Sequence, residues 1–136
     1  MKLTKNFELK EFLYSRFFNK YQEKVLEQFE ADKDILLPNV QKLANQLQVL
    51  RDYLGKPIHI NIAYRPYWWE IMQGRTGASQ HQFCKAADIK VDGLTPKEVA
   101  EAIEHLISNG DMLQGGIGSS YKSFTHYDIR RTKARW

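Results

Sequence analysis

The stretch SQHQFCKAADIK at residues 79–90 places a histidine and an aspartate, His81 and Asp88, on either side of a run of mostly small residues. The residues before His81 are small and polar, so backbone can approach a bound ion closely there. Asp88 stands between Ala87 and Ile89 in a segment typical of a strand, which puts its carboxylate beside a core. Such a charge is costly to bury unless it is paired or coordinated. The pair is therefore either two packed polar residues or two of three ligands to a metal ion.

A candidate third ligand stands near the end of the chain. His126 lies in FTHYDIR, a predicted strand that also carries apolar residues. Two histidines and one aspartate that leave a fourth position open form a common catalytic zinc site. The spacing of His81 and Asp88 is no general zinc signature, so the residues alone leave both interpretations open. The remaining histidines, His59 and His105, fall on a polar strand face and in a helix, and we expect no function for them.

The composition fits one globular domain over residues 1–136. The chain is 43% hydrophobic and 26% charged, and a chain of this size buries a core without a covalent staple. Its single cysteine, Cys84, excludes an intramolecular disulfide. No apolar run approaches the roughly 18 residues of a membrane span, and the first residues contain no apolar signal-peptide segment. We therefore expect a soluble chain that is made in the cytoplasm.

The formal net charge is +4, which favours an anionic partner without naming one. Basic residues gather in the final RRTKARW, which is most simply interpreted as a solvated end. The chain shows none of the usual nucleic-acid-binding motifs. An anionic polymer such as the bacterial cell wall fits the charge equally well.

Apolar spacing and end signals predict several helices. A short helix is expected within residues 3–18. A long one is expected from Pro38, which suits a first helical turn, to Gly55, which suits the position just past the end. Another follows the capping box formed by Thr95 and Glu98. The aromatic residues of the first segment that we expect to pack on the core are Phe7, Phe12, Phe17 and Phe18.

Short strands are predicted in the second half of the chain. Residues 58–64 alternate isoleucines with smaller or polar residues, and residues 86–91 form a second strand. A short helix and a loop separate these two strands, and GGIGSSYKSFTHYDIR predicts a closing hairpin. Helices first, then short strands with a helix between them, indicate an α+β fold, a small antiparallel sheet with helices packed on it.

Ser79, His81, Ala86 and Asp88 match the S-x-H-x-x-G-x-A-x-D motif of the zinc D-Ala-D-Ala carboxypeptidase family, which the chain resembles over most of its length. IAYRP is similar to the family's S-x-Y-R segment, GGIG to its glycine turn and FTHYDIR to its final H-x-D strand. The family includes L-alanyl-D-glutamate endopeptidases and many phage endolysins, and it shares its metal-site fold with the hedgehog signalling domain. The resemblance implies that fold and the hydrolysis of peptide bonds in bacterial peptidoglycan.

The resemblance also implies roles for single residues. His81, Asp88 and His126 would hold one zinc ion. Arg65 would hold a carboxylate of the peptide substrate, which suits a fixed, bidentate guanidinium. Ser79 would help to bind the same group.

We predict that Asp128 is the general base. Residues two apart in a strand point to the same face, so Asp128 would lie beside the attacking water if His126 binds the metal. The alternative is that Asp128 only orients a ligand histidine, or pairs with one of the arginines after it.

The sequence departs from the family motif at two positions. Cys84 stands where the motif has glycine, so the loop is expected to be reshaped, and its thiol either packs in the interior or approaches the metal. Ser123 stands three residues before His126, where several branches of the family carry their catalytic carboxylate, and a serine there cannot act as a base.

We expect a zinc metallopeptidase, a cell-wall hydrolase or phage endolysin, that is monomeric and binds a peptidoglycan peptide, with neither nucleic acid nor membrane as a partner. Without a signal peptide, it would act at the wall after release by lysis or when carried in a virion. The alternative is a catalytically inactive, metal-stabilised binding or virion-structural domain of the same fold, which the departures at Cys84 and Ser123 favour. A small nucleic-acid-binding protein is a weaker third interpretation that rests on charge alone.

Overall fold

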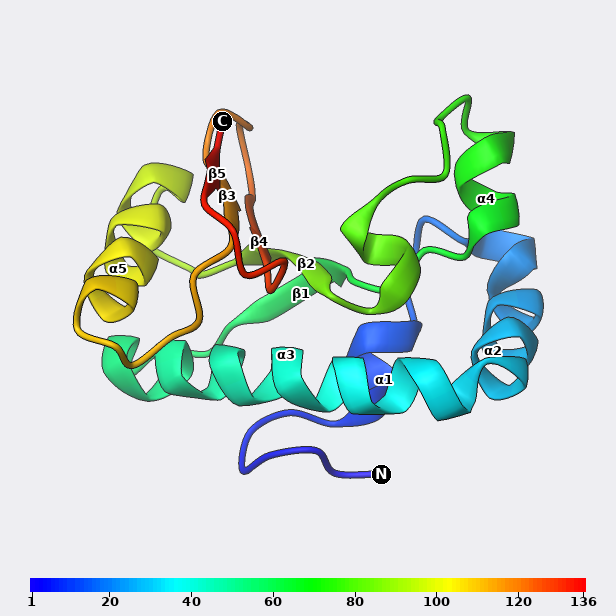
Figure 1. Ribbon diagram of the computed structural model, residues 1–136, viewed down its shortest axis with the longest axis horizontal. Helices are drawn as coiled ribbons and strands as arrows, with labels where there is room; N and C mark the ends of the chain where they lie inside the picture. Colours follow the sequence, from blue (N-terminus) through cyan, green and yellow to red (C-terminus); the bar gives the residue numbers. More distant parts are fainter.

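A computed structural model describes residues 1–136 and confirms the α+β fold (Figure 1). The helices and strands follow one another as α1 (Leu9–Leu13), α2 (Gln22–Ala31), α3 (Lys33–Leu54), β1 (His59–Ile62), α4 (Tyr67–Met72), β2 (Ala86–Lys90), α5 (Pro96–Ser108), β3 (Gly116–Gly118), β4 (Thr125–Asp128) and β5 (Ala134–Arg135). Two short 3-10 helices, η1 (Asn19–Tyr21) and η2 (Gln80–Phe83), lie in the connections. No helix is long and apolar enough to cross a membrane.

The five strands form one sheet in the order β1-β2-β4-β3-β5. The β1–β2, β2–β4 and β3–β4 pairs are antiparallel, and β3 and β4 form the predicted hairpin. The sheet is nevertheless mixed, because β5 pairs in parallel with β3. The predicted solvated end therefore contains a strand. Two residues are too few to show the alternation from which a strand is predicted.

Helix α3 begins earlier than predicted, at Lys33, so Pro38 lies inside the helix and not in its first turn. Proline in a helix interior removes one backbone hydrogen bond. Leu36, in the turn that precedes it, is buried, which offsets part of that cost. Gly55 ends the helix in the left-handed conformation, as expected from glycine at this position. The predicted capping box of Thr95 and Glu98 is present at the start of α5.

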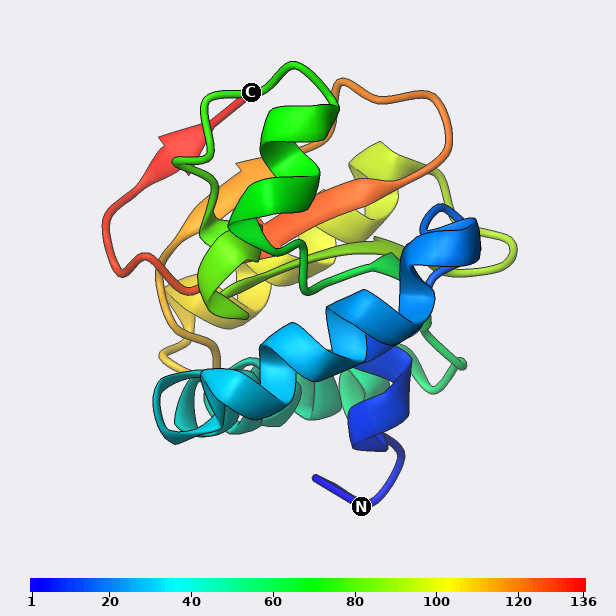
Figure 2. The same ribbon diagram turned by 90° about the vertical axis from the view of Figure 1, so that its right-hand side faces the viewer.

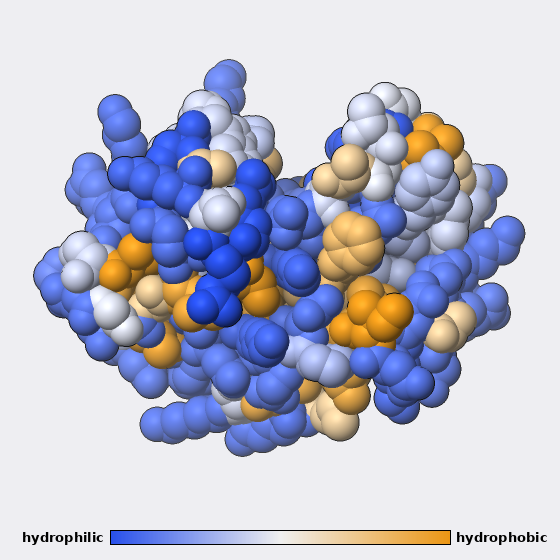
Figure 3. Space-filling model, in the orientation of Figure 1, coloured by the Kyte–Doolittle hydropathy of each residue, from blue (hydrophilic) through white to orange (hydrophobic).

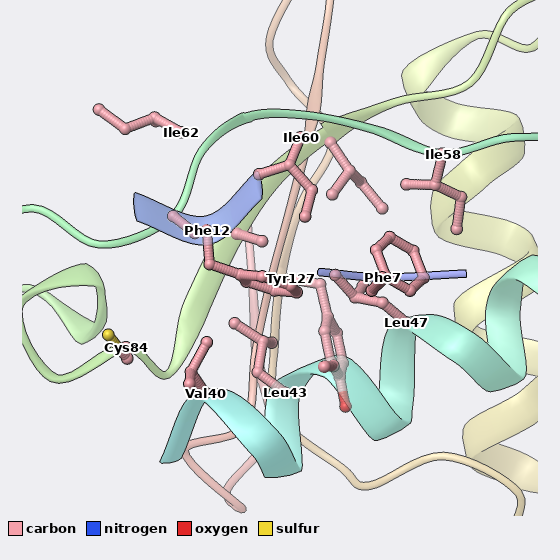
Figure 4. Packing of buried hydrophobic residues seen from close by; sticks show 14 of the residues in the cluster. Phe7, Phe12, Val40, Leu43, Leu47, Ile58, Ile60, Ile62, Cys84 and Tyr127 are labelled. Carbon is pink, nitrogen blue, oxygen red and sulfur yellow. The ribbon is translucent and has the colours of Figure 1, made fainter. Parts of the chain in front are cut away.

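The core lies between α3, α5 and one face of the sheet. Leu43 and Leu47 of α3 are fully buried and belong to the same apolar cluster as Ile60 of β1 and Tyr127 of β4 (Figure 4). Of the four aromatic residues expected in the core, Phe7, Phe12 and Phe18 are buried, whereas about half of Phe17 is exposed.

The opposite face of the sheet carries the polar residues. On β2, Ala87 and Ile89 belong to the core cluster, so Asp88 between them points to the other side. On β4, the buried Tyr127 separates His126 and Asp128 in the same way. In Figure 1, α3 runs below the sheet, while α4 and the β3–β5 region rise on either side of a gap above it. The fold thus leaves one face of the sheet as the floor of a possible site.

Candidate metal centre and cleft

The antiparallel pairing of β2 and β4 sets Asp88 directly opposite His126. Residues opposite each other in a sheet project to the same face, so the carboxylate and the imidazole meet. His81 comes from η2, the short turn just before β2. One ligand atom from each of the three residues lies within 4.8 Å of the others. The structure thus brings together the three predicted metal ligands, and all three side chains are buried.

One carboxylate oxygen is the centre of this cluster. Oδ1 of Asp88 lies 3.3 Å from Nε2 of His81 and 3.2 Å from Nδ1 of His126. Each histidine uses its other ring nitrogen elsewhere. Nδ1 of His81 lies 2.7 Å from the carbonyl oxygen of Ala63, and Nε2 of His126 lies 2.7 Å from Oδ2 of Asp128.

These outer partners fix the tautomer of each imidazole. Because the carbonyl oxygen of Ala63 and the carboxylate of Asp128 can only accept, each takes an N–H from its histidine. When both rings are neutral, His81 and His126 each turn a lone pair toward Asp88, itself an acceptor. Three acceptors then converge, and this arrangement requires a metal ion or a proton between them. This donor set, with each histidine held from behind, is the arrangement seen in protein metal sites.

The electrostatics favour the metal-binding state at His81 and Asp88, but not at His126. Burial lowers the pKa of His81, more than its contact with Asp88 raises it, so the ring is neutral. Burial alone would raise the pKa of Asp88, but its contacts with His126 and His81 outweigh burial and hold the pKa well below its ordinary value. A neutral imidazole and an ionised carboxylate are the protonation states in which these groups bind metal. Burial lowers the pKa of His126, but its contacts with Asp128 and Asp88 outweigh burial and raise the pKa, so a proton competes with a metal ion for this ring.

Asp128 is fully buried, and both of its carboxylate oxygens accept hydrogen bonds from the protein. Oδ1 accepts from the backbone N–H of Gly116, from the backbone N–H of Arg130 and from Nε of Arg130, at 2.9, 3.1 and 2.9 Å. Oδ2 accepts from Nη2 of Arg130 at 2.8 Å and from His126. A Cβ at Gly116 would collide with this carboxylate, which explains the glycine in the GGIG turn.

These contacts do not agree with the predicted role of Asp128 as general base. Burial raises its pKa, but the hydrogen bonds from His126 and Arg130 outweigh that effect and hold the pKa well below its ordinary value. A base is most effective when its pKa lies near the working pH and when it has an oxygen free to take the proton. The contacts favour the alternative considered from the sequence, in which Asp128 orients His126 and pairs with Arg130.

The two predicted substrate-binding residues also lie together. Nη2 of Arg65 donates to Oγ of Ser79 at 3.4 Å, and the same hydroxyl accepts from the backbone N–H of His81 at 3.1 Å. Nε of Arg65 forms an ion pair at 3.0 Å with Glu70, which is fully buried and is also paired with Arg75 at 2.9 Å. Glu70 therefore fixes the guanidinium of Arg65 from behind.

A cleft of about 440 Å³ lies over the cluster, and Figure 3 shows the surface hollowed between the two raised parts of the molecule. Arg65 and Ser79 line the cleft together with the three candidate ligands, and Asp88 is the one carboxylate among the lining residues. Trp136 closes one wall, with its ring 4.9 Å from that of His126. The cleft can therefore hold a small anionic group beside a metal ion.

The profile of the Peptidase M15 family matches residues 10–128 of the chain. The chain belongs to this family. No curated protein matches the sequence. The membership confirms the resemblance to the zinc D-Ala-D-Ala carboxypeptidases, and it makes a peptidase the general activity that the cleft is expected to support.

The two departures from the M15 motif have different structural outcomes. Cys84 adopts a left-handed backbone with φ of 58°, a conformation that glycine adopts without strain. Its thiol is buried in the core cluster, where burial raises its pKa, and it is not part of the metal cluster. Ser123 lines a different cavity and does not border the metal cleft.

Several residues of this peptidase cleft were not predicted. Glu70 pairs with Arg65, and Arg130 pairs with Asp128. Trp136 forms one wall of the cleft beside His126. A buried glutamate in YWWEIM gives no signal in the sequence, because its partners Arg65 and Arg75 lie five residues to either side, a spacing that is typical of neither helix nor strand pairs. Arg130 had a weak signal, since it follows Asp128 by two residues and was considered as a partner of that carboxylate.

Proposed function

We propose that the chain is a zinc peptidase that hydrolyses a peptide bond in the stem peptides of bacterial peptidoglycan. The observation that supports it most is the convergence of His81, Asp88 and His126, each histidine holding its remaining N–H on an outside acceptor. Among divalent metals, a two-histidine, one-carboxylate set with an open position suits catalytic zinc.

Zinc held by these residues would polarise the scissile carbonyl and lower the pKa of a water molecule toward about 7. Residues of the chain would orient the ligands and bind the substrate. Ala63 and Asp128 keep the two imidazoles oriented, and Trp136 shields His126 from solvent on one side. Arg65 and Ser79 bind a carboxylate of the substrate, so that the neighbouring peptide bond lies over the metal cluster.

Peptidoglycan is the substrate class that best combines these features. Its stem peptides offer free carboxylates for Arg65, and the net charge of +4 suits an anionic polymer. We propose a monomer that reaches the wall after release by lysis or in a virion. Neither a nucleic acid nor a membrane is part of the proposal.

One observation favours the alternative, a metal-stabilised domain that binds the wall without cleaving it. Asp88 is the one carboxylate that lines the cleft, and in both candidate functions it would bind the metal, so no separate carboxylate is available to accept the water's proton. Asp128 is fully occupied and Ser123 lies elsewhere. The peptidase and the binding domain therefore make different predictions for the same preparation.

The deciding experiment measures soluble peptide release from purified sacculi by the metal-free protein, and again after one equivalent of zinc is added. His81→Ala removes a ligand, and His105→Ala, at an exposed position of α5, is its matched control. The peptidase predicts release that depends on zinc, is lost in His81→Ala and is kept in His105→Ala.

The binding domain predicts zinc binding and sedimentation with the sacculi without any release. Release that continues in the presence of a chelator would contradict both candidates, because each needs the metal.

A further inference from the structure

A second and larger cavity, of about 740 Å³, lies beside the metal cleft. Its lining includes Arg16, His59, Asn61, Lys90 and Ser123, and it contains no carboxylate. We call Arg16, His59 and Lys90 the basic subsite. In Figure 2, the segment after α1 (blue) and the loop before β4 (orange), which contribute Arg16 and Ser123, lie on the same side of the molecule.

The strands connect this cavity to the metal cluster. Lys90 follows Asp88 by two residues on β2, so both side chains project from the open face of the sheet. Two residues of strand span about 6.6 Å, roughly the length of two residues of an extended peptide. His59 is the partner of Lys90 on β1 and adds a second nitrogen group at that position.

The charges of the basic subsite are not neutralised within the protein. Neither Arg16 nor Lys90 has a carboxylate within 4.0 Å, unlike Arg65, Arg75, Arg130 and Arg135, which are all paired. The Arg16 guanidinium lies 5.2 Å from the ring centre of Phe17, a contact that leaves its N–H donors available. Two unpaired cations around a cavity without acidic residues raise the local concentration of anions.

We propose that the basic subsite binds a second carboxylate of a peptide whose first carboxylate is held by Arg65, and this inference rests on the proposed peptidase function. Arg65 follows the end of β1 that pairs with Asp88, whereas Lys90 lies opposite His59 at the other end of β1, so the two cationic positions lie in opposite directions from Asp88 along the strands. A substrate that satisfies both is an acidic peptide with one carboxylate on each side of the bond to be cut. The affinity for a peptide then depends on both of its carboxylates, so a stem peptide in which one carboxylate is amidated binds less well.

The test compares two synthetic stem tetrapeptides, one with the glutamate α-carboxylate free and one with it amidated. Their dissociation constants are measured by chemical-shift titration of ¹⁵N-labelled protein in buffer of low ionic strength. The free acid is expected to bind about tenfold more tightly than the amide, because exposed ion pairs are individually weak. The backbone amides of Arg16, His59 and Lys90 are expected to shift with the acid and not with the amide.

Variants assign the effect to this cavity. Arg16→Gln combined with Lys90→Gln should bring the ratio of the two constants close to one. Lys5→Gln combined with Lys42→Gln removes the same charge at exposed positions outside the cavity and should keep the wild-type ratio. Equal affinity for both peptides in the wild type, or a ratio that survives in the first double variant, would overturn the proposal.

Hydrolysis of sacculi is measured separately on the same preparations. A protein that discriminates between the peptides through Arg16 and Lys90 but releases nothing from sacculi would retain the subsite and contradict the peptidase. A protein that cleaves sacculi but binds the two peptides equally well would support the peptidase and contradict the subsite.

Discussion

Oδ2 of Asp128 lies 2.7 Å from Nε2 of His126, two residues earlier on the same strand. Because both side chains project from one face of β4, the carboxylate stands behind the imidazole and leaves Nδ1 directed at Asp88. Arg130 pairs with the same carboxylate and keeps it ionised. The three residues form a chain of contacts that ends at the metal position.

Asp128→Asn is expected to weaken zinc binding by about 10- to 100-fold, the usual effect of a residue that orients a metal ligand. Turnover of the zinc-saturated variant should fall by less than about tenfold, whereas loss of a general base costs roughly 10²- to 10⁴-fold. Competition with a chelating dye gives the affinity and peptide release from sacculi gives the turnover. Asp92→Asn, on an exposed turn, is the control. A loss of several orders of magnitude with zinc fully bound would restore Asp128 as the base.

Removal of metal is expected to lower thermal stability, because the free energy of metal binding to His81, Asp88 and His126 adds to the free energy of folding. Free zinc at 1,000 times its dissociation constant stabilises a fold by about 4 kcal/mol. For a chain of this size, that corresponds to a fall in melting temperature of roughly 15 °C on chelation. Calorimetry with and without chelator measures it. His81→Ala should melt at one temperature under both conditions, and an unchanged wild type would contradict the ligand assignment.

Arg65→Lys is expected to reduce kcat/KM by about 10- to 100-fold at unchanged zinc content. Lysine keeps the charge that pairs with Glu70 but cannot present two parallel N–H groups to a carboxylate. The loss of a charge-assisted hydrogen bond of this kind has about that effect. Steady-state kinetics on a soluble stem peptide separates the variant from Arg51→Lys, a control on α3. Wild-type kinetics would make Arg65 a structural ion pair only.

The three candidate ligands could be predicted because their positions follow from local rules and from one strand pairing. Asp88 and His126 each alternate with buried residues, which assigns them to the open face, and the family motif singles out the same positions. The pairing of β2 and β4 then sets them opposite each other. The helix after Thr95 was equally predictable, since a capping box is local in sequence.

Contacts that do not follow a regular helix or strand spacing could not be predicted in the same way. The contacts of Asp128 include Gly116, which reaches it from a neighbouring strand, and Arg130, for which the sequence gave only a weak signal. The start of α3 was misplaced, because Pro38 is a start signal in most helices and here lies where burial of Leu36 compensates. In each case a tertiary contact outweighed the local preference.

At Cys84 we expect the usual stability order of an alanine and a glycine substitution to be reversed. The residue adopts φ of 58°, a left-handed backbone conformation that costs most residues other than glycine about 1–2 kcal/mol. Cys84→Ala loses the buried sulfur and keeps the strain. Cys84→Gly loses slightly more packing but removes the strain. Alanine is normally the more stabilising of the two because it restricts the unfolded chain.

Cys84→Gly is therefore expected to be at least as stable as Cys84→Ala, and by about 1 kcal/mol more stable if the backbone keeps its conformation. Urea unfolding of the two variants measures the difference. Both should bind one zinc ion with wild-type affinity, because the thiol packs in the core and takes no part in the metal cluster. A Cys84→Ala variant that unfolds at a higher urea concentration than Cys84→Gly would show that the left-handed conformation is not retained. A loss of zinc affinity in both variants would make the thiol a ligand.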